Sequence, residues 1–524
     1  MPTTTTTTRA RTSGPVRPEQ AAIGVPETLP TPPDVFPNFV NGKWVPSKSP
    51  KRVANTNPAD TRQVMGHVPQ SSVEEANAAI EAAAAAFPPW RDTPAPVRAR
   101  SLYRLLELLE KHKNELGAIL TLEEGKVFGE SVGEVSKSAN VVEFYAGEGR
   151  RIAGETLPSE MPRTFCYTLH QPMGVISLIT PWNFPYAIPC WKIAPALITG
   201  NTVVWKPATL TPWTAYRLME LFAEAGIPDG VVNLVYGSGG EVGRALIDHP
   251  AVRGVSFTGS TEVGTEVYAR GAARLLKVQC EMGGKNPLVV LEDANLELAA
   301  AATAQGAFGS TGQRCTATSR AIVVNKVADE FVKRVVQLGS AAHVGNGLGS
   351  GVTMGPSVDA SQMKTVLDYI KIGEREGASH QLGGRHLETG EWEHGHFVTP
   401  CVFDRVRPAS RLAQEEIFGP VLSVIRVADF HEAVKVANEV RFGLSSSIYT
   451  HDSNLALRFI DAIETGIVHV NSPTVGGEAQ LPFGGVKGTG VGSREQGKTA
   501  LDFFTEVKTV YFDYTGSKRE TNIY

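Results

Sequence analysis

The chain has 524 residues, of which 42% are hydrophobic and 20% are charged, and its formal net charge is −4. This length predicts two or three domains of a folded protein, and the slight acidity argues against a nucleic-acid binder, whose surface would be basic. The lack of an apolar run of about 18 residues argues against a membrane partner, and the five cysteines, without a CxxC pair, favour a reducing cytoplasm over a disulfide scaffold.

The N-terminal segment, residues 1–35, predicts a disordered arm. A run of threonines at 3–8 and prolines from 15 to 33 leave little apolar surface to offset the entropy of ordering. The segment lacks the apolar core of a secretion signal, so we do not expect it to direct secretion. Its arginines leave an organellar transit role open as an alternative to a cytoplasmic location.

The next segments predict a hairpin and helices. An Asn-Gly pair inside residues 39–45 predicts a β-hairpin. Residues 71–75 carry a capping-box pattern and predict the start of an Ala-rich helix that reaches residue 87. Leucines at helical spacing predict one amphipathic helix over residues 97–120.

From residue 174 on, short β-type runs alternate with helical segments. Four such units between residues 174 and 269 predict an α/β fold with a parallel sheet and helical crossovers. A second α/β series begins at residue 286 and runs past residue 447. The last β-type run, in residues 499–514, is able to join a sheet edge of a neighbouring subunit.

Cys315, in the segment TGQRC, is the candidate nucleophile. It lies in a turn rich in Gly, Ser and Thr, and the neighbouring Arg314 would favour the reactive thiolate. The alternative is an inert, small apolar side chain. That second interpretation is the one we give to the other four cysteines, Cys166, Cys190, Cys280 and Cys401.

Glu281 and Asn183 are the candidate base and oxyanion donor. Glu281 ends an apolar strand beside a Gly-Gly turn, where partial burial would raise its pKa and suit it to general-base work. Its alternative is a salt bridge to Lys285 or to another cation. Asn183 lies between two prolines and two aromatic residues, and a rigid amide suits an oxyanion hole. Its alternative is a turn asparagine that bonds its own backbone.

Three strand ends predict a nucleotide site. A glycine-rich turn at residues 237–243 is one residue longer than the usual dinucleotide fingerprint, and a second glycine turn lies at residues 257–261. Lys206 closes another strand and is able to bind a ribose hydroxyl or a phosphate. We expect no metal site, because the only tight histidine pair, at 394 and 396, has no matching ligands nearby in the sequence.

Seven motifs together resemble one enzyme family. PWNFP, WKPA, FTGST, EMGGKNP, GQRC, EEIFGP and PFGG occur in this order, and the resemblance runs from about residue 39 to 511. The chain thus resembles the NAD(P)-dependent aldehyde dehydrogenase superfamily. This resemblance implies a Rossmann-like cofactor domain (36–153 and 171–280), an α/β catalytic domain (281–498) and a small β oligomerisation element (154–170 and 499–516). It also implies a homodimer or a homotetramer.

The resemblance assigns roles residue by residue. Cys315 would attack the aldehyde, Asn183 and the backbone N–H of Cys315 would hold the oxyanion, and Glu281 would activate water to hydrolyse the thioester. The presence of Glu281 argues for hydrolysis over thioester transfer to coenzyme A. The residues implied for NAD or NADP are Trp182, Lys206, Thr209, Gly239, Gly259, Ser260, Gly283, Glu416 and Phe418.

Thr209 departs from the pattern of NAD-preferring relatives, which commonly have Glu three residues after the lysine. Without that carboxylate a 2′-phosphate meets no repulsion, and a hydroxyl is able to donate to it. We therefore expect NADP to be accepted or even preferred.

The substrate is the aldehyde of a small molecule. The segments 143–155, 312–320 and 493–511 look most like 2-oxoglutarate semialdehyde (2,5-dioxopentanoate) dehydrogenases, with succinate semialdehyde as the near alternative. The substrate carboxylate requires a cation, and Arg150 or Arg151 is a candidate unless both are merely solvated. Gly309 replaces an arginine common in succinate semialdehyde enzymes, which leaves room for an aromatic or aliphatic aldehyde near Phe184 and Phe483.

Two other classes of function are alternatives. A cysteine hydrolase would also use Cys315 but needs a histidine partner, and none adjoins it in the sequence. A structural protein on this fold would not need Cys315, Glu281 and Asn183 together.

Overall fold

The computed structural model describes residues 22–518, so the predicted arm at 1–21 lies outside the described residues. The prediction of disorder does not hold for residues 22–35. The N–H of Ala22 donates to the carbonyl of Leu348 at 2.8 Å, and Val25 and Leu29 pack against the main core. Part of the segment therefore lies against the core through partly buried apolar side chains.

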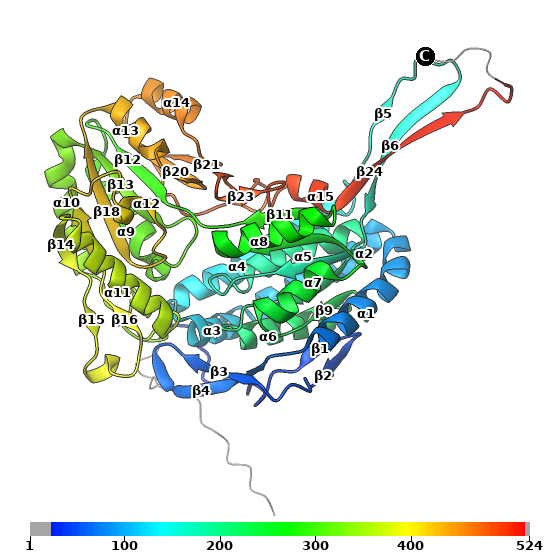
Figure 1. The fold of residues 1–524 in the computed structure, drawn as a ribbon, viewed down its shortest axis with the longest axis horizontal. Helices are drawn as coiled ribbons and strands as arrows, with labels where there is room; N and C mark the ends of the chain where they lie inside the picture. The colour runs from blue at the N-terminus through cyan, green and yellow to red at the C-terminus, as the bar shows by residue number, and fades with distance from the viewer. Residues whose placement is uncertain (1–21, 519–524) are drawn as a thin grey trace, which may run out of the picture.

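The first lobe is built on an eight-stranded sheet in the order β2-β1-β9-β8-β7-β10-β11-β23 (Figure 1). The strands β9, β8, β7, β10 and β11 run parallel, whereas β1 and β23 pair antiparallel at the two sides. Their bounds are β1 Asn38–Val40, β2 Lys43–Val45, β7 Val175–Ile179, β8 Thr202–Lys206, β9 Val232–Leu234, β10 Val252–Thr258, β11 Lys277–Glu281 and β23 Gly490–Val491. The strand order reverses at β7, which predicts a binding crevice at the carboxyl ends of these strands.

Helices cover both faces of this sheet, as the near-continuous apolar strands require. Ile176 and Leu178 of β7 face the cluster formed with α2 to α6, whereas Val175 and Ile179 face α1, α7 and α8. The helices are α1 Val73–Asp92, α2 Ala95–Lys111, α3 Lys113–Glu124, α4 Phe128–Glu148, α5 Ala187–Thr199, α6 Pro212–Glu224, α7 Arg244–Asp248 and α8 Thr261–Ala273. The four crossover helices α5 to α8 confirm the predicted β-then-α units.

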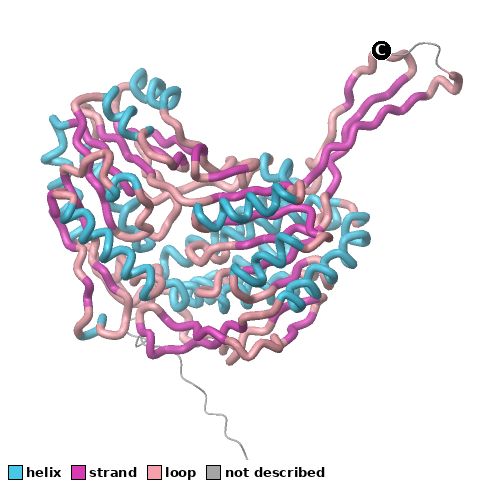
Figure 2. Tube along the Cα trace, viewed as in Figure 1, coloured by secondary structure: helices cyan, strands magenta, loops and turns pink. Residues whose placement is uncertain are grey.

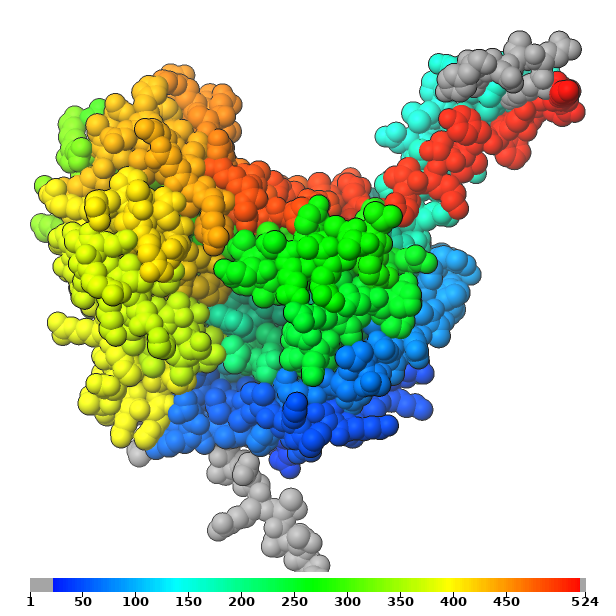
Figure 3. All heavy atoms as spheres, viewed as in Figure 1, coloured from blue at the N-terminus to red at the C-terminus, as the bar shows by residue number. Residues whose placement is uncertain are grey.

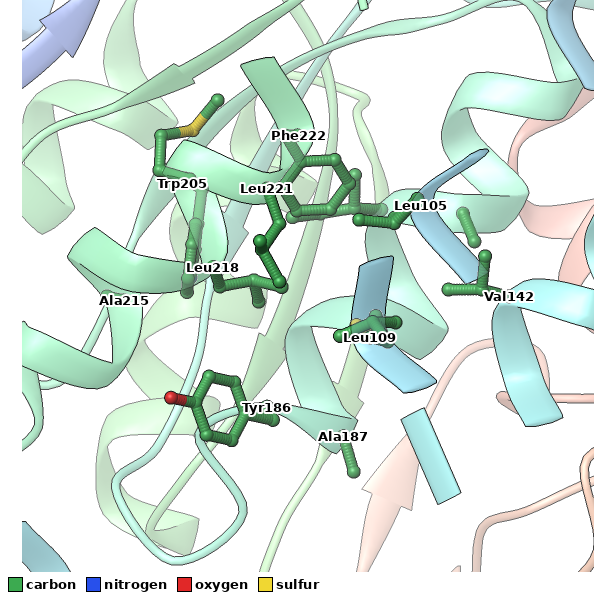
Figure 4. Close-up of a cluster of buried hydrophobic side chains, with 14 of the residues drawn as sticks. Leu105, Leu109, Val142, Tyr186, Ala187, Trp205, Ala215, Leu218, Leu221 and Phe222 are labelled. Carbon is green, nitrogen blue, oxygen red and sulfur yellow. The ribbon is translucent and has the colours of Figure 1, made fainter. Parts of the chain in front are cut away.

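The larger cluster joins segments far apart in the sequence (Figure 4). Leu105 and Leu109 of α2 approach Val142 of α4 and Phe222 of α6, next to Trp205 of β8, and all five side chains are buried. Each such side chain contributes roughly 1.5–3 kcal/mol on burial. This packing fixes α4 against the sheet that carries the candidate site.

Two predicted helices differ in detail. The capping box at Ser72 and Glu75 is present, but α1 runs on to Asp92. The segment 97–120 is two helices, not one, because the backbone bends at His112, whose ring bonds the carboxylate of Glu115 at 3.1 Å. The leucine spacing continues across the bend, so periodicity alone does not reveal it.

The second lobe is built on a seven-stranded sheet in the order β14-β17-β18-β13-β12-β20-β21, parallel except for β14. Its strands are β12 Asn286–Val290, β13 Thr318–Val324, β14 Ser379–Gly383, β17 Cys401–Asp404, β18 Val421–Val427, β20 Ser445–Tyr449 and β21 Ile467–Val470. Its helices are α9 Leu296–Phe308, α10 Asn325–Ser340, α11 Ala360–Arg375, α12 Arg411–Gln414, α13 Phe430–Asn438 and α14 Ser453–Ala462.

Shorter elements complete the two lobes. They are the ribbon β3 Arg52–Asn57 and β4 Asp60–Pro69, the pairs β15 His386–Leu387 with β16 Phe397–Val398 and β19 Phe442–Gly443 with β22 Val486–Lys487, and the turns η2 Gly239–Gly243, η3 Gly309–Gly312 and η4 Gly390–Trp392. The division into domains differs from the expected one at β23. This strand lies within the segment 281–498, the expected catalytic domain. It nevertheless joins the first sheet, because the chain crosses back from the second lobe after β21 and pairs with β11.

A three-stranded arm projects from the first lobe (Figures 1 and 2). It contains β5 Thr156–Leu157, β6 Thr164–Pro172 and β24 Thr505–Asp513, which follows α15 Thr499–Phe503. The strand β24 pairs with β6 over its whole length, from Thr505 opposite Pro172 to Asp513 opposite Thr164. The segments expected to form an oligomerisation element thus do share one sheet.

Within residues 22–518, no helix combines the length and apolar character needed to cross a membrane. The same residues hold no group of three or more His, Cys, Asp or Glu that would bind a metal ion.

Candidate active site

The carboxyl ends of the first sheet carry five of the predicted site residues. Asn183 follows β7, Lys206 ends β8, Gly239 follows β9, Gly259 follows β10 and Glu281 ends β11. In a parallel sheet these ends lie along one edge, so the predicted catalytic and cofactor groups of the first lobe share that edge.

The second lobe contributes residues at the opposite ends of its strands. Cys315 comes shortly before β13, and Glu416 and Phe418 come shortly before β18, so these residues lie at the amino ends of parallel strands. The two lobes meet there, and Figure 3 shows the surface hollowed between the second lobe, in yellow and orange, and the green helices of the first. Direct contacts join the two edges. The N–H of Gly284 donates to Glu416 at 2.8 Å, and the rings of Trp182 and Phe418 pack edge to face at 5.4 Å.

An unusual backbone presents Cys315. The helix α9 gives way to a turn in which Ser310 and Thr311 have φ of 47° and 57°, a left-handed conformation that costs non-glycine residues free energy. Glu130 of α4 accepts the N–H of Ser310, and the side-chain amide of Asn286 donates to the carbonyls of Cys315 and Ala317, both at 2.8 Å. These contacts from the first lobe and from β12 hold the loop in place.

Cys315 is half-buried as a residue, and the pKa of its thiol is raised to about 12. Burial by the surrounding protein is the main cause, and the carboxyl groups of Glu416 and Glu281 add to it. The expectation that Arg314 favours the thiolate is not supported. Its guanidinium pairs with Glu130 at 2.8 Å and bonds Ser310, so it is engaged away from the sulfur.

The other cysteines are buried in the structure, as the sequence predicts for inert side chains. Burial raises the pKa of the thiols of Cys190 and Cys280 to about 12, and that of Cys401 further. Cys315 is therefore the one cysteine in the described residues that is only half-buried as a residue.

Asn183 is fixed beside the nucleophile loop. Its side-chain amide donates to the carbonyl of Gln313 at 3.1 Å, two residues before Cys315, and not to its own backbone. Its backbone carbonyl accepts a hydrogen bond of 2.7 Å from the buried Lys126, whose ammonium also pairs with Glu134 of α4. The amide is thus a rigid donor next to the nucleophile, as an oxyanion hole requires.

Glu281 is buried, and neither Lys285 nor any other cation of residues 22–518 lies within salt-bridge distance of it, so the salt-bridge alternative is wrong. One carboxylate oxygen of Glu281 and the ammonium of Lys285 each have no hydrogen-bond partner among the described residues. Burial raises the pKa of Glu281 well above its ordinary value, the nearby charge of Glu495 adds to this, and Lys192 partly offsets it. A carboxylate with a raised pKa and a free oxygen is suited to take a proton from water.

Glu495 and Lys192 were not predicted from the sequence. They form a buried ion pair beside Glu281, and Lys192 also donates to the hydroxyl of Ser256 at 2.7 Å. Their separation of 303 positions hides the pair from any local pattern. A signal existed only for Lys192, which is a lone charged residue in the apolar helix α5.

The residues predicted to bind the dinucleotide are arranged in a way that suits this ligand. Lys206 is buried at the end of β8, its ammonium donates to the carbonyl of Pro207 at 2.9 Å, and burial lowers its pKa to about 8. Thr209 lies half-buried three residues further on. The hydroxyl of Thr258, at the end of β10, has no partner within the described part of the chain, and a side chain at Gly239 would meet only open space.

The last predicted cofactor residues surround a second carboxylate. Burial raises the pKa of Glu416 to about 7, and a Cβ on Gly283 would lie 2.3 Å from its carboxylate, so a larger residue there would displace this carboxylate. Phe418 has a φ of 58°, and its carbonyl accepts a hydrogen bond from Gln362 at 2.9 Å. Ser260 caps α8 and accepts the N–H of Val263.

The predicted substrate residues divide into two groups. Phe184 lies beneath the ammonium of Lys126 at 4.2 Å, and Phe483 packs on Trp191 with 5.4 Å between ring centroids. The arginines lie at the end of α4, where Arg150 is exposed and Arg151 pairs with Glu148 at 2.7 Å. Of the two candidates, Arg150 is thus surrounded by solvent, and Arg151 already pairs with a carboxylate of the protein.

Comparison with known proteins decides the family. Residues 44–510 match the family described as "Aldehyde dehydrogenase family". The chain belongs to the aldehyde dehydrogenase family. It is 46% identical to an alpha-ketoglutarate semialdehyde dehydrogenase of Haloferax volcanii, over 92% of this chain and 100% of that one.

Solved structures support the same family. A betaine aldehyde dehydrogenase of Staphylococcus aureus in complex with NAD+ superposes with a TM-score of 0.90 at 32% identity, covering 93% of this chain and 96% of that one. An E. coli NADP dependent enzyme gives a TM-score of 0.88 at 37% identity, covering 91% of this chain and 98% of that one. The predicted family, enzyme class and fold are confirmed, and the two structures agree with the predicted cofactor, NAD or NADP.

Proposed function

We propose that this aldehyde dehydrogenase oxidises an ω-oxo acid, of which 2,5-dioxopentanoate is the favoured example, to the dicarboxylic acid with NAD(P)+. The observation that carries the reaction is the convergence of Cys315, Asn183 and Glu281 where the two lobes meet. The 46% identity to an alpha-ketoglutarate semialdehyde dehydrogenase supports the substrate class. The family match favours oxidation of an aldehyde over the alternative function, a cysteine hydrolase.

Cys315 and Asn183 carry the first half of the reaction. The thiolate of Cys315 attacks the aldehyde carbon, and the oxyanion that forms accepts hydrogen bonds from the Asn183 amide and the backbone N–H of Cys315. When bound, the nicotinamide ring of the cofactor supplies the hydride acceptor for this oxidation. The substrate carbon is then held as a thioester on Cys315.

Glu281 carries the second half. It takes a proton from a water molecule, the hydroxide attacks the thioester carbonyl, and the carboxylic acid leaves as the thiolate of Cys315 is restored. The ion pair of Glu495 and Lys192 lies next to Glu281, where Glu495 raises the pKa of this buried acid and Lys192 lowers it.

The cofactor would lie along the carboxyl ends of β7 to β10. Lys206 and Thr209 would hold the ribose of the adenosine, the turns at Gly239, Gly259 and Ser260 would line the pyrophosphate, and Gly283, Glu416, Phe418 and Trp182 would position the nicotinamide half. Thr209 supports use of NADP. We further infer a cytoplasmic homodimer or homotetramer, in which the arm of β5, β6 and β24 joins the subunits.

An aldehyde panel tests the proposal. Reduction of each cofactor is followed at about 340 nm, where reduced nicotinamide absorbs, with 2,5-dioxopentanoate, succinate semialdehyde, benzaldehyde and pentanal as substrates. The proposal predicts the highest kcat/KM for 2,5-dioxopentanoate. A higher value for an uncharged aldehyde would contradict it.

A further inference from the structure

A hollow of about 650 Å³ lies between α4 and the loop that follows β21. Its walls include Lys137, Glu143 and Arg151 from α4 and the turn after it, Tyr103 of α2, and residues 477–480 of the loop. Both positive and negative side chains therefore line it.

The loop of this hollow links the nucleophile to the base. At its beginning the hydroxyl of Thr474 donates to the carbonyl of Thr316, the residue after Cys315, at 2.8 Å. At its end a Cβ on Gly484 would lie 2.2 Å from a carboxylate oxygen of Glu281. Gly477 is three residues from Thr474, so this wall lies within about 10 Å of it along the chain. The hollow thus adjoins the catalytic centre.

The helix α4, on the other wall of the hollow, is also linked to the catalytic residues. The carboxylate of Glu134 accepts the N–H groups of Tyr186 and Ala187, which follow Asn183. Lys137 is one helical turn further along α4, a rise of roughly 5 Å. Lys137 also reaches across to the loop, where its ammonium donates to the carbonyl of Gly477 at 2.6 Å and to the side chain of Gln496 at 3.1 Å.

Lys137 differs from the other cations nearby in its partners. Arg314 is paired with Glu130, Arg151 with Glu148 and Lys126 with Glu134. No carboxylate lies within salt-bridge distance of the Lys137 ammonium among residues 22–518, and its bonds go to neutral oxygens. The charge of Glu478 acts on the Lys137 ammonium from beyond salt-bridge distance, so the ammonium has no ion-pair partner and is able to take an incoming carboxylate.

We propose that Lys137 binds the carboxylate of the ω-oxo acid and that this hollow is where the charged end of the substrate lies while its aldehyde reaches Cys315. This rests on the proposed function and adds the residue that selects the substrate. The acidic Glu143 and Glu478 also lie on these walls and would repel an anion that is not paired with the ammonium. Charge thus directs the substrate with its aldehyde end inward.

The test is the selectivity ratio, which is kcat/KM for 2,5-dioxopentanoate divided by kcat/KM for pentanal. Both aldehydes have five carbons, and only the first has a carboxylate. In Lys137→Met the ratio should fall about 10-fold to 100-fold, through KM, as expected when a charge-assisted hydrogen bond is lost. Lys137→Arg should restore most of it. Lys113→Met is the matched control, because Lys113 pairs with Glu110 at the surface, and its ratio should stay at the wild-type value.

Each other outcome has a definite meaning. An equal loss on both substrates in Lys137→Met, with no recovery in Lys137→Arg, would show that Lys137 only supports the loop and would overturn the assignment. A selective loss in Arg151→Met but not in Lys137→Met would overturn it in favour of Arg151. If the wild-type enzyme does not prefer 2,5-dioxopentanoate, the proposed function fails; if it does and Lys137→Met retains the preference, only the assignment of Lys137 fails.

Discussion

The side-chain amide of Asn183 donates a hydrogen bond of 3.1 Å to the carbonyl of Gln313, two residues before Cys315. This bond places a donor of the first lobe against the nucleophile loop of the second. Asn183→Ala should lower kcat/KM about 100-fold to 1,000-fold, as removal of one oxyanion donor does elsewhere. Steady-state kinetics with thermal unfolding as control checks this. A full loss of the melting transition would show that the bond serves folding instead.

The raised pKa of Cys315 predicts a pH dependence. Burial and the carboxyl groups of Glu416 and Glu281 raise the pKa of this thiol to about 12, so the reactive thiolate is a small fraction at neutral pH and grows as the pH rises. In cofactor-free enzyme, alkylation by iodoacetamide should accelerate about tenfold per pH unit from pH 7 to 9. Cys315→Ala, analysed by mass spectrometry, is the control for labelling elsewhere. A rate that levels off near pH 7 would refute the assignment of a raised pKa.

Thr209 is the position that should set cofactor choice. In Thr209→Glu a carboxylate would face the 2′-phosphate of NADP, and the ratio of kcat/KM for NADP over NAD should fall at least about tenfold, or 1.4 kcal/mol. Thr209→Ala separates the loss of a hydroxyl from the gain of charge and should change the ratio less. An unchanged ratio in Thr209→Glu would mean that the adenosine ribose lies elsewhere.

The arm should carry the subunit contacts. Three large apolar side chains of β24 are more than half exposed, namely Val507 at 60%, Tyr511 at 68% and Phe512 at 58%. Apolar surface of this kind favours association. The double variant Tyr511→Lys, Phe512→Lys should therefore sediment as a smaller species than wild type in analytical ultracentrifugation. Identical sedimentation would place the contacts outside the arm.

The sequence predicted the first lobe better than the contacts that complete the site. Strands such as β7 and β8 are short apolar runs with polar residues at their carboxyl ends, and these local patterns revealed Asn183, Lys206 and Glu281. The second lobe presents Cys315 and Glu416 at the amino ends of its strands, and no rule about strand ends predicts that arrangement. The segment TGQRC made Cys315 a candidate that an inert cysteine fitted as well, and only the resemblance to a family supplied the role of Glu416.

Residues that act through distant partners could not be predicted. Glu130 is 180 positions from Ser310, and Lys137 is 359 positions from Gln496. In the sequence each is an ordinary polar residue of an amphipathic helix, and its partner is defined only when the lobes pack. The same reason explains the unsupported role of Arg314, since its partner Glu130 comes from another helix.

The most direct test of the account is to trap the thioester intermediate on Cys315. Glu281→Gln removes the base but leaves Cys315 and Asn183 intact, so the thioester should form and hydrolyse about 100-fold to 10,000-fold more slowly. The variant is mixed with 2,5-dioxopentanoate and NADP+, and intact-protein and peptide mass spectrometry then locates the adduct. The account predicts one burst of reduced cofactor per active site and an acyl group of substrate mass on Cys315. Steady turnover at the wild-type rate, or an adduct on a different residue, would contradict it.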